Sequence, residues 1–181
     1  MMRLHFIAIG GSAMHSLAIA LKENGDQISG SDDAIFDPSK TQLLKAAIYP
    51  EKMGWHPEKI STDLDAVILG MHAKADNPEL ITAQSLGLKI YSYPEFIAHF
   101  SKRKTRVVIA GSHGKTTISA MVLHVLKYHD RSVDFMLGAQ LDGYNNSVSL
   151  TDKNDFILLE GDEYLSSPID LTPKFHHYKP Q

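Results

Sequence analysis

Short, nearly continuous apolar runs alternate with amphipathic stretches over the first part of the chain. Continuous apolar runs are typical of strands that are buried on both faces of a parallel sheet. Between them, apolar residues recur every three or four positions, which predicts helices. The expected strands cover residues 4–9, 27–32, 66–69 and 88–91, and the expected helices cover residues 14–23, 38–47, 78–86 and 94–100. This alternation predicts an α/β fold that begins with a Rossmann-like parallel sheet.

The same pattern starts again near residue 107. Residues 107–110 are an apolar run that predicts a buried strand, and the glycines within residues 111–114 predict a tight turn. A helix is expected from Lys115, and its apolar residues recur at helical spacing. The predicted buried stripe consists of Ile118, Met121, Val122, Val125 and Leu126.

This strand, turn and helix predict a polyphosphate site. Backbone N–H groups and the positive end of the helix would face the phosphates. Lys115 is placed to reach the outer phosphates, and the Thr116 hydroxyl is placed to bind Mg²⁺. The full Walker pattern has a glycine five residues before Gly114, where this chain has Ile109, so only the Gly-Lys-Thr core matches. A glycine turn with an incidental lysine and threonine is the alternative.

A group of carboxylates follows a later apolar run. Further strands are expected at residues 133–138 and 155–159, and the second of them ends in Glu160-Gly161-Asp162-Glu163-Tyr164. A magnesium-binding carboxylate belongs at the end of a strand beside a phosphate-binding turn. Glu160 is therefore a candidate metal ligand, and an acidic surface turn is the alternative.

The first strand also runs into a glycine turn. Against the dinucleotide-binding pattern G-x-G-x-x-G, Gly10 holds the middle position, whereas Ala8 and Ala13 replace the first and third glycines. Asp32 lies about 20 residues further on, where that pattern has an acid near the ribose. The motif predicts a nucleotide-binding βαβ unit, and a plain strand–turn–helix is an equal alternative.

Other polar residues are expected at the same edge of the first sheet. In open α/β sheets, ligands bind beyond the carboxyl ends of the strands. Ser31 and Asp32 end the second strand, and His72 and Asn77 follow the third. We expect these side chains near the ligand, although a loop histidine with a local hydrogen bond is as good an interpretation of His72.

A basic, polar stretch separates the two patterns. Residues 101–106 read Ser-Lys-Arg-Lys-Thr-Arg, without interleaved aromatic residues, so a solvated linker is favoured over a nucleic-acid-binding patch. We place a domain boundary there, with one domain at 1–104 and another at 105–181. The second is short for a P-loop nucleotidase, so a truncated domain is expected.

Composition narrows the possible functions. The net charge is −3, so neither a nucleic acid nor a membrane surface is an expected partner. The chain has no cysteine, which excludes disulfides and thiolate metal sites. No apolar run approaches the length of a membrane helix, and none has the form of a signal peptide. A cytoplasmic protein is expected.

Three motifs together resemble the Mur ligases, the ATP-dependent ligases that build the peptide stem of bacterial peptidoglycan. Residues 9–14 with Gly30-Ser31-Asp32 resemble the UDP-sugar domain of the UDP-N-acetylmuramate ligases. Residues 110–117 resemble the variant P-loop of the family, with Ser112 where threonine is usual. Residues 160–164 resemble the segment that carries a magnesium-binding glutamate.

The resemblance implies site residues in both domains. The implied UDP-sugar-binding residues are Gly10, Gly11, Ser12, Ala13, Met14, Ser31, Asp32, His72 and Asn77. The implied ATP-binding residues are Gly111, Ser112, His113, Gly114, Lys115, Thr116 and Thr117. The implied catalytic residues are Lys115 and Glu160, and the implied Mg²⁺ ligands are Thr116 and Glu160.

The resemblance also implies a reaction. ATP would phosphorylate the carboxylate of UDP-N-acetylmuramate, and an amine would attack the acyl phosphate. Two groups of the family fit: one joins L-alanine, and the other joins the recycled tripeptide L-alanyl-γ-D-glutamyl-meso-diaminopimelate. Tyr164 and residues 174–180 resemble the tripeptide ligases more closely. Oligomeric state is left open.

Because the family has a third, C-terminal domain, this chain is expected to be an inactive N-terminal fragment. Two alternatives of another class remain. One is a UDP-sugar-binding module without catalysis. The other is a nicotinamide-dependent oxidoreductase, which the missing first glycine disfavours and which has no use for the Gly-Lys-Thr core.

Overall fold

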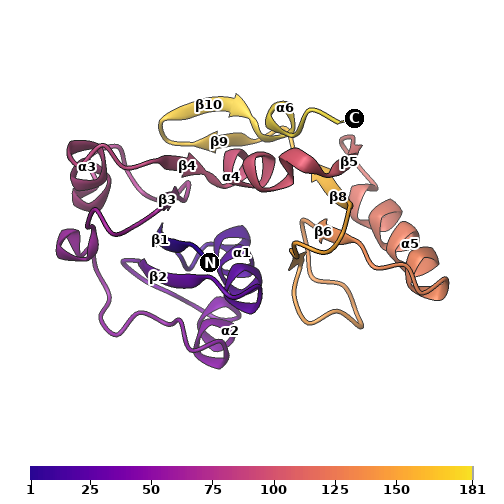
Figure 1. Ribbon diagram of the computed structural model, residues 1–181, viewed down its shortest axis with the longest axis horizontal. Helices are drawn as coiled ribbons and strands as arrows, with labels where there is room; N and C mark the ends of the chain where they lie inside the picture. Colours follow the sequence, from indigo (N-terminus) through magenta and orange to yellow (C-terminus); the bar gives the residue numbers. More distant parts are fainter. Residues whose placement is uncertain (181) are drawn as a thin grey trace. The chain divides into compact units, whose positions relative to one another are not determined.

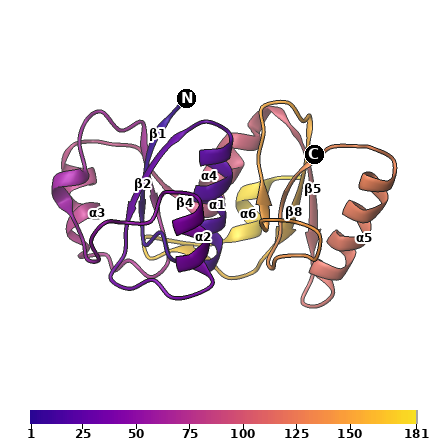
Figure 2. The same ribbon diagram turned by 90° about the horizontal axis from the view of Figure 1, so that it is seen from below.

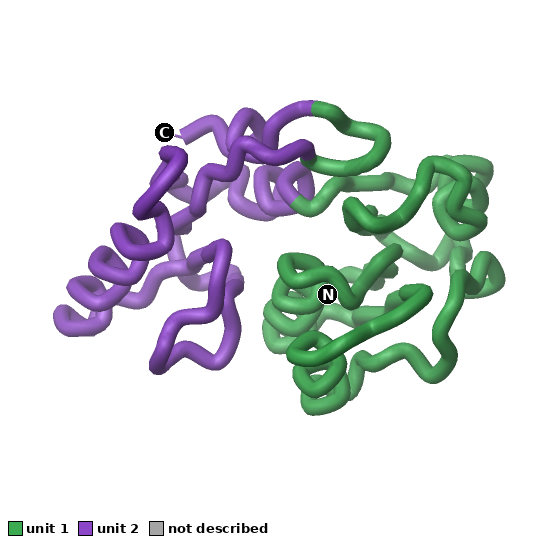
Figure 3. The backbone as a smooth tube through the Cα atoms, turned by 180° about the vertical axis from the view of Figure 1, so that it is seen from behind, with its two compact units in different colours: residues 1–93, 166–171 green, residues 94–165, 172–181 purple. Residues whose placement is uncertain are grey.

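The computed structural model describes residues 1–180, which form two compact units (Figure 3). Unit 1 comprises residues 1–93 and 166–171, and unit 2 comprises residues 94–165 and 172–181. The first boundary between the two compact units therefore falls after Tyr93. The domain boundary expected after Lys104 stays a prediction.

Unit 1 contains a four-stranded parallel sheet (Figure 1). Its strands are β1 (Arg3–Ile7), β2 (Gln27–Ser31), β3 (Ala66–Leu69) and β4 (Ile90–Ser92). The order is β2-β1-β3-β4, so β1 and β3 lie in the middle. This sheet confirms the Rossmann-like α/β fold predicted from the apolar runs.

Helices cover both faces of this sheet. α1 (Ser12–Glu23) and α2 (Ser39–Lys45) lie on one side and α3 (Pro78–Ser85) on the other (Figure 2). A 3₁₀ turn, η1 (Pro57–Lys59), precedes β3, and α4 (Tyr93–Phe100) follows β4. The largest fully buried side chains come from β1, β3 and the helices and include Leu4, Phe6, Ile7, Leu17, Leu21, Leu69 and Leu80.

Unit 2 contains a second four-stranded sheet in the order β5-β8-β6-β7. Its strands are β5 (Thr105–Ala110), β6 (Asp134–Met136), β7 (Val148–Ser149) and β8 (Phe156–Gly161). β5, β8 and β6 are parallel, and the short β7 is antiparallel to β6. The helix α5 (Lys115–Tyr128) connects β5 to β6 and packs against β5 and β8.

Three elements near the end of the chain were not predicted. β9 (Leu165–Ser167) and β10 (Asp170–Pro173) form a two-stranded sheet, and the short helix α6 (Lys174–Tyr178) follows. α6 contacts β5 and β8, and the fully buried Tyr178 places its hydroxyl 3.9 Å from the sulfur of Met136.

The expected solvated linker at residues 101–106 is wrong. Ser101–Arg103 form a 3₁₀ turn, η2, and β5 already begins at Thr105. Lys104 and Arg106 are buried. The ammonium of Lys104 lies 2.9 Å from Asp134 Oδ2 and donates to the Thr151 carbonyl at 2.7 Å, and these partners compensate its burial.

The apolar stripe predicted on α5 is only partly correct. Val122 and Leu126 are half-buried, whereas Ile118, Met121 and Val125 are exposed. Leu123 is the buried apolar residue of the helix, and it packs with Phe135 and Leu158.

None of the helices described within residues 1–180 has the length and apolar character that a membrane span requires.

Candidate functional site

The turn after β5 has the backbone that an anion site requires. Gly114 caps α5 with φ of 76°, and Gly111 has φ of 148°. These are left-handed conformations that glycine adopts without the strain of a Cβ atom. Ser112 and His113 lie between them and are exposed, as is Thr117 in the first turn of α5. The first N–H groups of the helix have no intrahelical partner, so they are available to an anion.

Lys115 folds back over this turn. It is the first residue of α5, and its ammonium donates a 2.6 Å hydrogen bond to the Gly111 carbonyl. The side chain is half-buried, so the cation stays beside the N–H groups and remains within reach of solvent. Lysine and N–H groups together can hold a polyphosphate.

Glu160 lies at the end of β8, directly beside the turn. The parallel register pairs it with Ile109 of β5. Its Oε2 accepts hydrogen bonds from the Thr116 hydroxyl and the Gly138 N–H, both at 3.0 Å. The two residues predicted as metal ligands, 44 positions apart, are thus brought together.

The donor atoms beside this turn fit a magnesium ion. Glu160 is only 5% exposed, and its Oε1 has no hydrogen-bond partner within residues 1–180. A buried carboxylate oxygen without a partner is costly unless a cation or a water satisfies it. Carboxylate and hydroxyl oxygens are hard ligands of the kind that Mg²⁺ prefers.

Gly138 is a site residue that the sequence analysis missed. A Cβ atom at this position would lie 2.9 Å from Glu160 Oε2 and 4.0 Å from the Thr116 hydroxyl oxygen. Only glycine therefore lets the backbone N–H approach the carboxylate. Its position at the end of the strand predicted at residues 133–138 was a usable signal, since the carboxyl ends of parallel strands meet at one edge.

Asp162, a second carboxylate of the acidic segment, has a structural role. Asp162 Oδ2 forms a 2.9 Å ion pair with Lys174, and its Oδ1 accepts from the Tyr164 N–H at 2.9 Å. These contacts hold α6 and the segment after β8 together.

The glycine turn of unit 1 is held by Asp32. The Gly10 N–H donates to Asp32 Oδ2 at 2.7 Å, and a Cβ atom on Gly10 would lie 2.9 Å from the same oxygen. Burial raises the pKa of Asp32, and the Gly10 hydrogen bond offsets this only in part. Ala8, which stands where the pattern has its first glycine, has φ of 65°, a conformation that glycine favours.

The remaining turn residues open α1. Gly11 is the N-cap, and Ser12 and Ala13 are exposed in the first helical turn. Met14 is buried and contributes its side chain to the core. His15, which was not among the predicted site residues, contacts this turn through its side chain. Its Nδ1 lies 3.0 Å from the Gly11 carbonyl oxygen.

Three more predicted residues lie after the strands of the sheet. Ser31 is buried at the end of β2, and His72 is exposed in the segment between β3 and α3. Asn77 is buried and caps α3, because its Oδ1 accepts from the N–H groups of Glu79 and Leu80. The ligand-binding roles of all nine residues stay predictions.

Comparison with known proteins identifies relatives of one kind. Residues 3–105 match the Mur ligase family, catalytic domain. The chain is 32% identical over 175 residues to a UDP-N-acetylmuramate--L-alanine ligase of Carboxydothermus hydrogenoformans, covering 96% of this chain and 37% of the relative. It is 36% identical over 173 residues to a protein of the same name from Sulfurihydrogenibium, covering 94% and 37%.

Solved structures agree in fold. A UDP-N-acetylmuramate:L-alanyl-gamma-D-glutamyl-meso-diaminopimelate ligase from Neisseria meningitides superposes with a TM-score of 0.86 and 29% identity, over 99% of this chain and 58% of that one. A UDP-N-acetylmuramate-alanine ligase from Thermotoga maritima gives a TM-score of 0.75 and 28% identity, over 91% and 38%. The chain therefore spans little more than a third of the curated relatives it matches.

Proposed function

Because the chain belongs to the Mur ligase family, we propose that it supplies the nucleotide-sugar site and the ATP site of an ATP-dependent, amide-forming ligase of peptidoglycan assembly. The carboxylate substrate is UDP-N-acetylmuramate, and the second substrate is an amino acid or a peptide. In this proposal unit 1 binds the nucleotide sugar, and unit 2 binds ATP with Mg²⁺. The cytoplasmic location expected from the sequence stays a prediction.

The arrangement of Thr116, Glu160 and Gly138 carries the proposal. A buried carboxylate with one unsatisfied oxygen lies next to a hydroxyl, at the base of a glycine turn that carries Lys115. A plain glycine turn has no need for a buried glutamate at this point. Nicotinamide binding is disfavoured because the oxidoreductase reaction has no role for Lys115 or Glu160.

Each residue of the proposed ATP site has a separate task. The turn N–H groups and the Lys115 ammonium bind the phosphates and stabilise charge on the transferred phosphoryl group. Thr116 and Glu160 would hold Mg²⁺, which when bound neutralises charge on the phosphate oxygens. The Gly138 N–H keeps the Glu160 carboxylate oriented toward Thr116. Transfer of the γ-phosphoryl group to the sugar carboxylate releases ADP, and attack of an amine on the resulting acyl phosphate forms the amide and releases phosphate.

The tripeptide is our proposal for the amine, on the basis of Tyr164 and residues 174–180. The Neisseria structure, whose name gives that tripeptide, supports it. L-Alanine is the second candidate, because both curated relatives described above are named for it.

Calorimetric titration of this chain tests the proposal. We expect UDP-N-acetylmuramate to bind, ATP to bind more tightly with Mg²⁺ than in EDTA, and NAD not to bind. A coupled assay of ADP release, run with L-alanine and with the tripeptide, then tests for turnover. Binding without turnover would mean that the chain is a binding module, and ADP release with one amine would identify the amine. Absence of nucleotide-sugar binding by a folded chain would contradict the role proposed for unit 1.

A further inference from the structure

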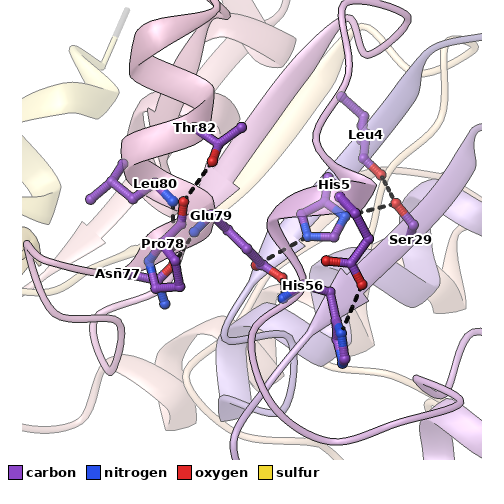
Figure 4. A network of polar contacts seen from close by, with 10 residues as sticks. Leu4, His5, Ser29, His56, Asn77, Pro78, Glu79, Leu80 and Thr82 are labelled. Atoms are coloured by element: carbon purple, nitrogen blue, oxygen red, sulfur yellow. Dashed lines mark hydrogen bonds and ion pairs between the residues drawn. The ribbon is translucent and has the colours of Figure 1, made fainter.

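A fully buried carboxylate in unit 1 is not among the predicted site residues. Glu79 is the second residue of α3, and it is 0% exposed. Its Oε2 lies 3.3 Å from His5 Nε2, and His5 is also 0% exposed. Its Oε1 accepts a 2.6 Å hydrogen bond from the His56 backbone N–H (Figure 4).

These contacts tie four segments to one side chain. His5 lies in the middle of β1, and its other ring nitrogen lies 2.9 Å from the Ser29 hydroxyl of β2 (Figure 4). β2 also carries Ser31 at its end, whose buried hydroxyl has no hydrogen-bond partner within residues 1–180. The third segment contains His56, and the fourth is the start of α3 itself.

Each tied segment carries a residue of the proposed nucleotide-sugar site or contacts one. The N–H of Gly54, two residues before His56, donates to the Asp32 carbonyl at 2.7 Å. Asn77 caps the turn of α3 that contains Glu79, with its Oδ1 2.9 Å from the Glu79 nitrogen. Glu79 thus contacts segments that carry or contact Ser31, Asp32 and Asn77, while its complete burial keeps it away from a ligand.

The carboxylate is ionised at neutral pH. Burial alone would raise the pKa of Glu79, but the hydrogen bonds from His5 and from the His56 N–H outweigh it and lower the pKa. The titratable groups that face it are His5 and His56, and the His56 ring in turn lies 3.1 Å from Glu58. A buried polar contact adds little net stability compared with an apolar contact, whereas it restricts where its partners can lie.

We infer that Glu79 is a positioning residue of the nucleotide-sugar site: through His5 and the His56 N–H it holds β2, the start of α3 and the His56 segment in their binding geometry without touching the ligand. The inference rests on the proposed function of unit 1. Preorganisation of this kind reduces the ordering that a ligand must otherwise impose. Its loss should therefore weaken binding of the nucleotide sugar and leave ATP binding by unit 2 unchanged.

The test compares Glu79→Gln with the unmodified chain. Calorimetry should show that Glu79→Gln binds UDP-N-acetylmuramate about tenfold more weakly than the unmodified chain does. An effect of this size is typical when a residue acts on a binding site without contacting the ligand. ATP·Mg²⁺ affinity should stay within about twofold. In ¹H–¹⁵N spectra, the amides of Asp32, Gly54 and His56 should shift. Ile68→Val, in β3, is the control: it removes one buried methylene, and it should lower the melting temperature without changing affinity or these amides.

A second pair of variants covers the case in which Glu79→Gln does not fold. His5→Leu removes the ring that contacts the carboxylate and should weaken nucleotide-sugar binding, whereas His5→Gln retains an N–H group and should bind within about twofold of the unmodified chain. Equal affinity in Glu79→Gln or in His5→Leu, with only the melting temperature lowered, would overturn the inference. If the unmodified chain itself fails to bind the nucleotide sugar, the proposed function of unit 1 fails first.

Discussion

The two units use the same local design, a strand, a glycine turn and a helix, but they enclose it differently. In unit 1 every residue of α1 from Met14 to Leu21 is buried. In unit 2, α5 buries only Ser119 and Leu123, and Met121 is 65% exposed. The strands differ in the same way, since β3 is buried throughout whereas Val107 of β5 is 43% exposed.

The difference shows that a strand, turn and helix can form a site without a closed core around them. A groove of about 760 Å³ lies between α5 and the sheet of unit 2, and Val107, Val122, Leu126 and Leu158 line part of it. Despite this open side, the turn and Glu160 have well-defined partners. The predictions below test how far the two units differ in packing and in function.

The largest expected effect is on packing. Leu80→Ala in α3 removes a fully buried side chain from the unit 1 core and should lower stability by about 3 kcal/mol. Met121→Ala, the matched change on the exposed face of α5, should cost no more than about 0.5 kcal/mol. Thermal and urea unfolding of both variants measure this. Equal losses would mean that the face of α5 is covered in solution and that the contrast between the units is wrong.

The next effect is on function. Lys115→Ala removes the cation beside the phosphate-binding turn and should weaken ATP·Mg²⁺ binding at least about 100-fold. Binding of the nucleotide sugar by unit 1 should stay unchanged, as calorimetry with each ligand can show. Lys127→Ala is the control, because Lys127 lies in the last turn of the same helix and stacks on Tyr144. A parallel loss of both affinities in Lys115→Ala would argue against separate sites in the two units.

A smaller change tests the geometry behind the turn. Gly138→Ala places a methyl group 2.9 Å from Glu160 Oε2, so the carboxylate must move away from Thr116. We expect magnesium-dependent ATP affinity to fall about tenfold. Affinity for ATP measured in EDTA serves as the internal control and should not change. If both affinities are unaffected, Glu160 does not hold the metal.

The smallest effect is on acid stability. The pKa of Glu79 is lower in the folded chain than its ordinary value of 4.5, because its hydrogen bonds outweigh the effect of burial. Its contribution to stability is therefore complete above pH 4.5 and is lost as the pH falls through the lowered pKa. As the pH is lowered from 4.5, the melting temperature of Glu79→Gln should fall less than the melting temperature of the unmodified chain. Glu51→Gln, a change at an exposed position, should behave like the unmodified chain. If the melting temperature of Glu79→Gln falls with pH as steeply as that of the unmodified chain, another group is responsible for the acid sensitivity.

Much of the fold could be predicted because apolar runs and helical spacing are local signals. β1, β3 and β4 of unit 1, and β5, β6 and β8 of unit 2, follow such runs, whereas β2 has the sequence Gln-Ile-Ser-Gly-Ser. β9, β10 and α6 could not be predicted, since residues 165–178 mix polar and apolar residues without a clear period. The buried Lys104 was also missed, because its partner Asp134 is remote in sequence and only the sheet brings the two together.

The candidate site was predictable in part for the same reason. Lys115, Thr116 and Glu160 have recognisable neighbours along the chain, and parallel strands bring their ends to one edge. Glu79 has no such signal, because its role depends on which atoms approach it in space. Ala8 shows a third case: the expected glycine is absent, yet the backbone takes the left-handed conformation with φ of 65°.

The separation between Thr116 and Glu160 also has a consequence for how the protein is made. A hydrogen bond that joins residues 44 positions apart cannot form until β8 has been synthesised and has paired with β5. The glycine turn needs only neighbouring residues, so it can form earlier, because contacts between distant positions cost more chain entropy. During synthesis on the ribosome, the turn can therefore form before the contact between Thr116 and Glu160 does.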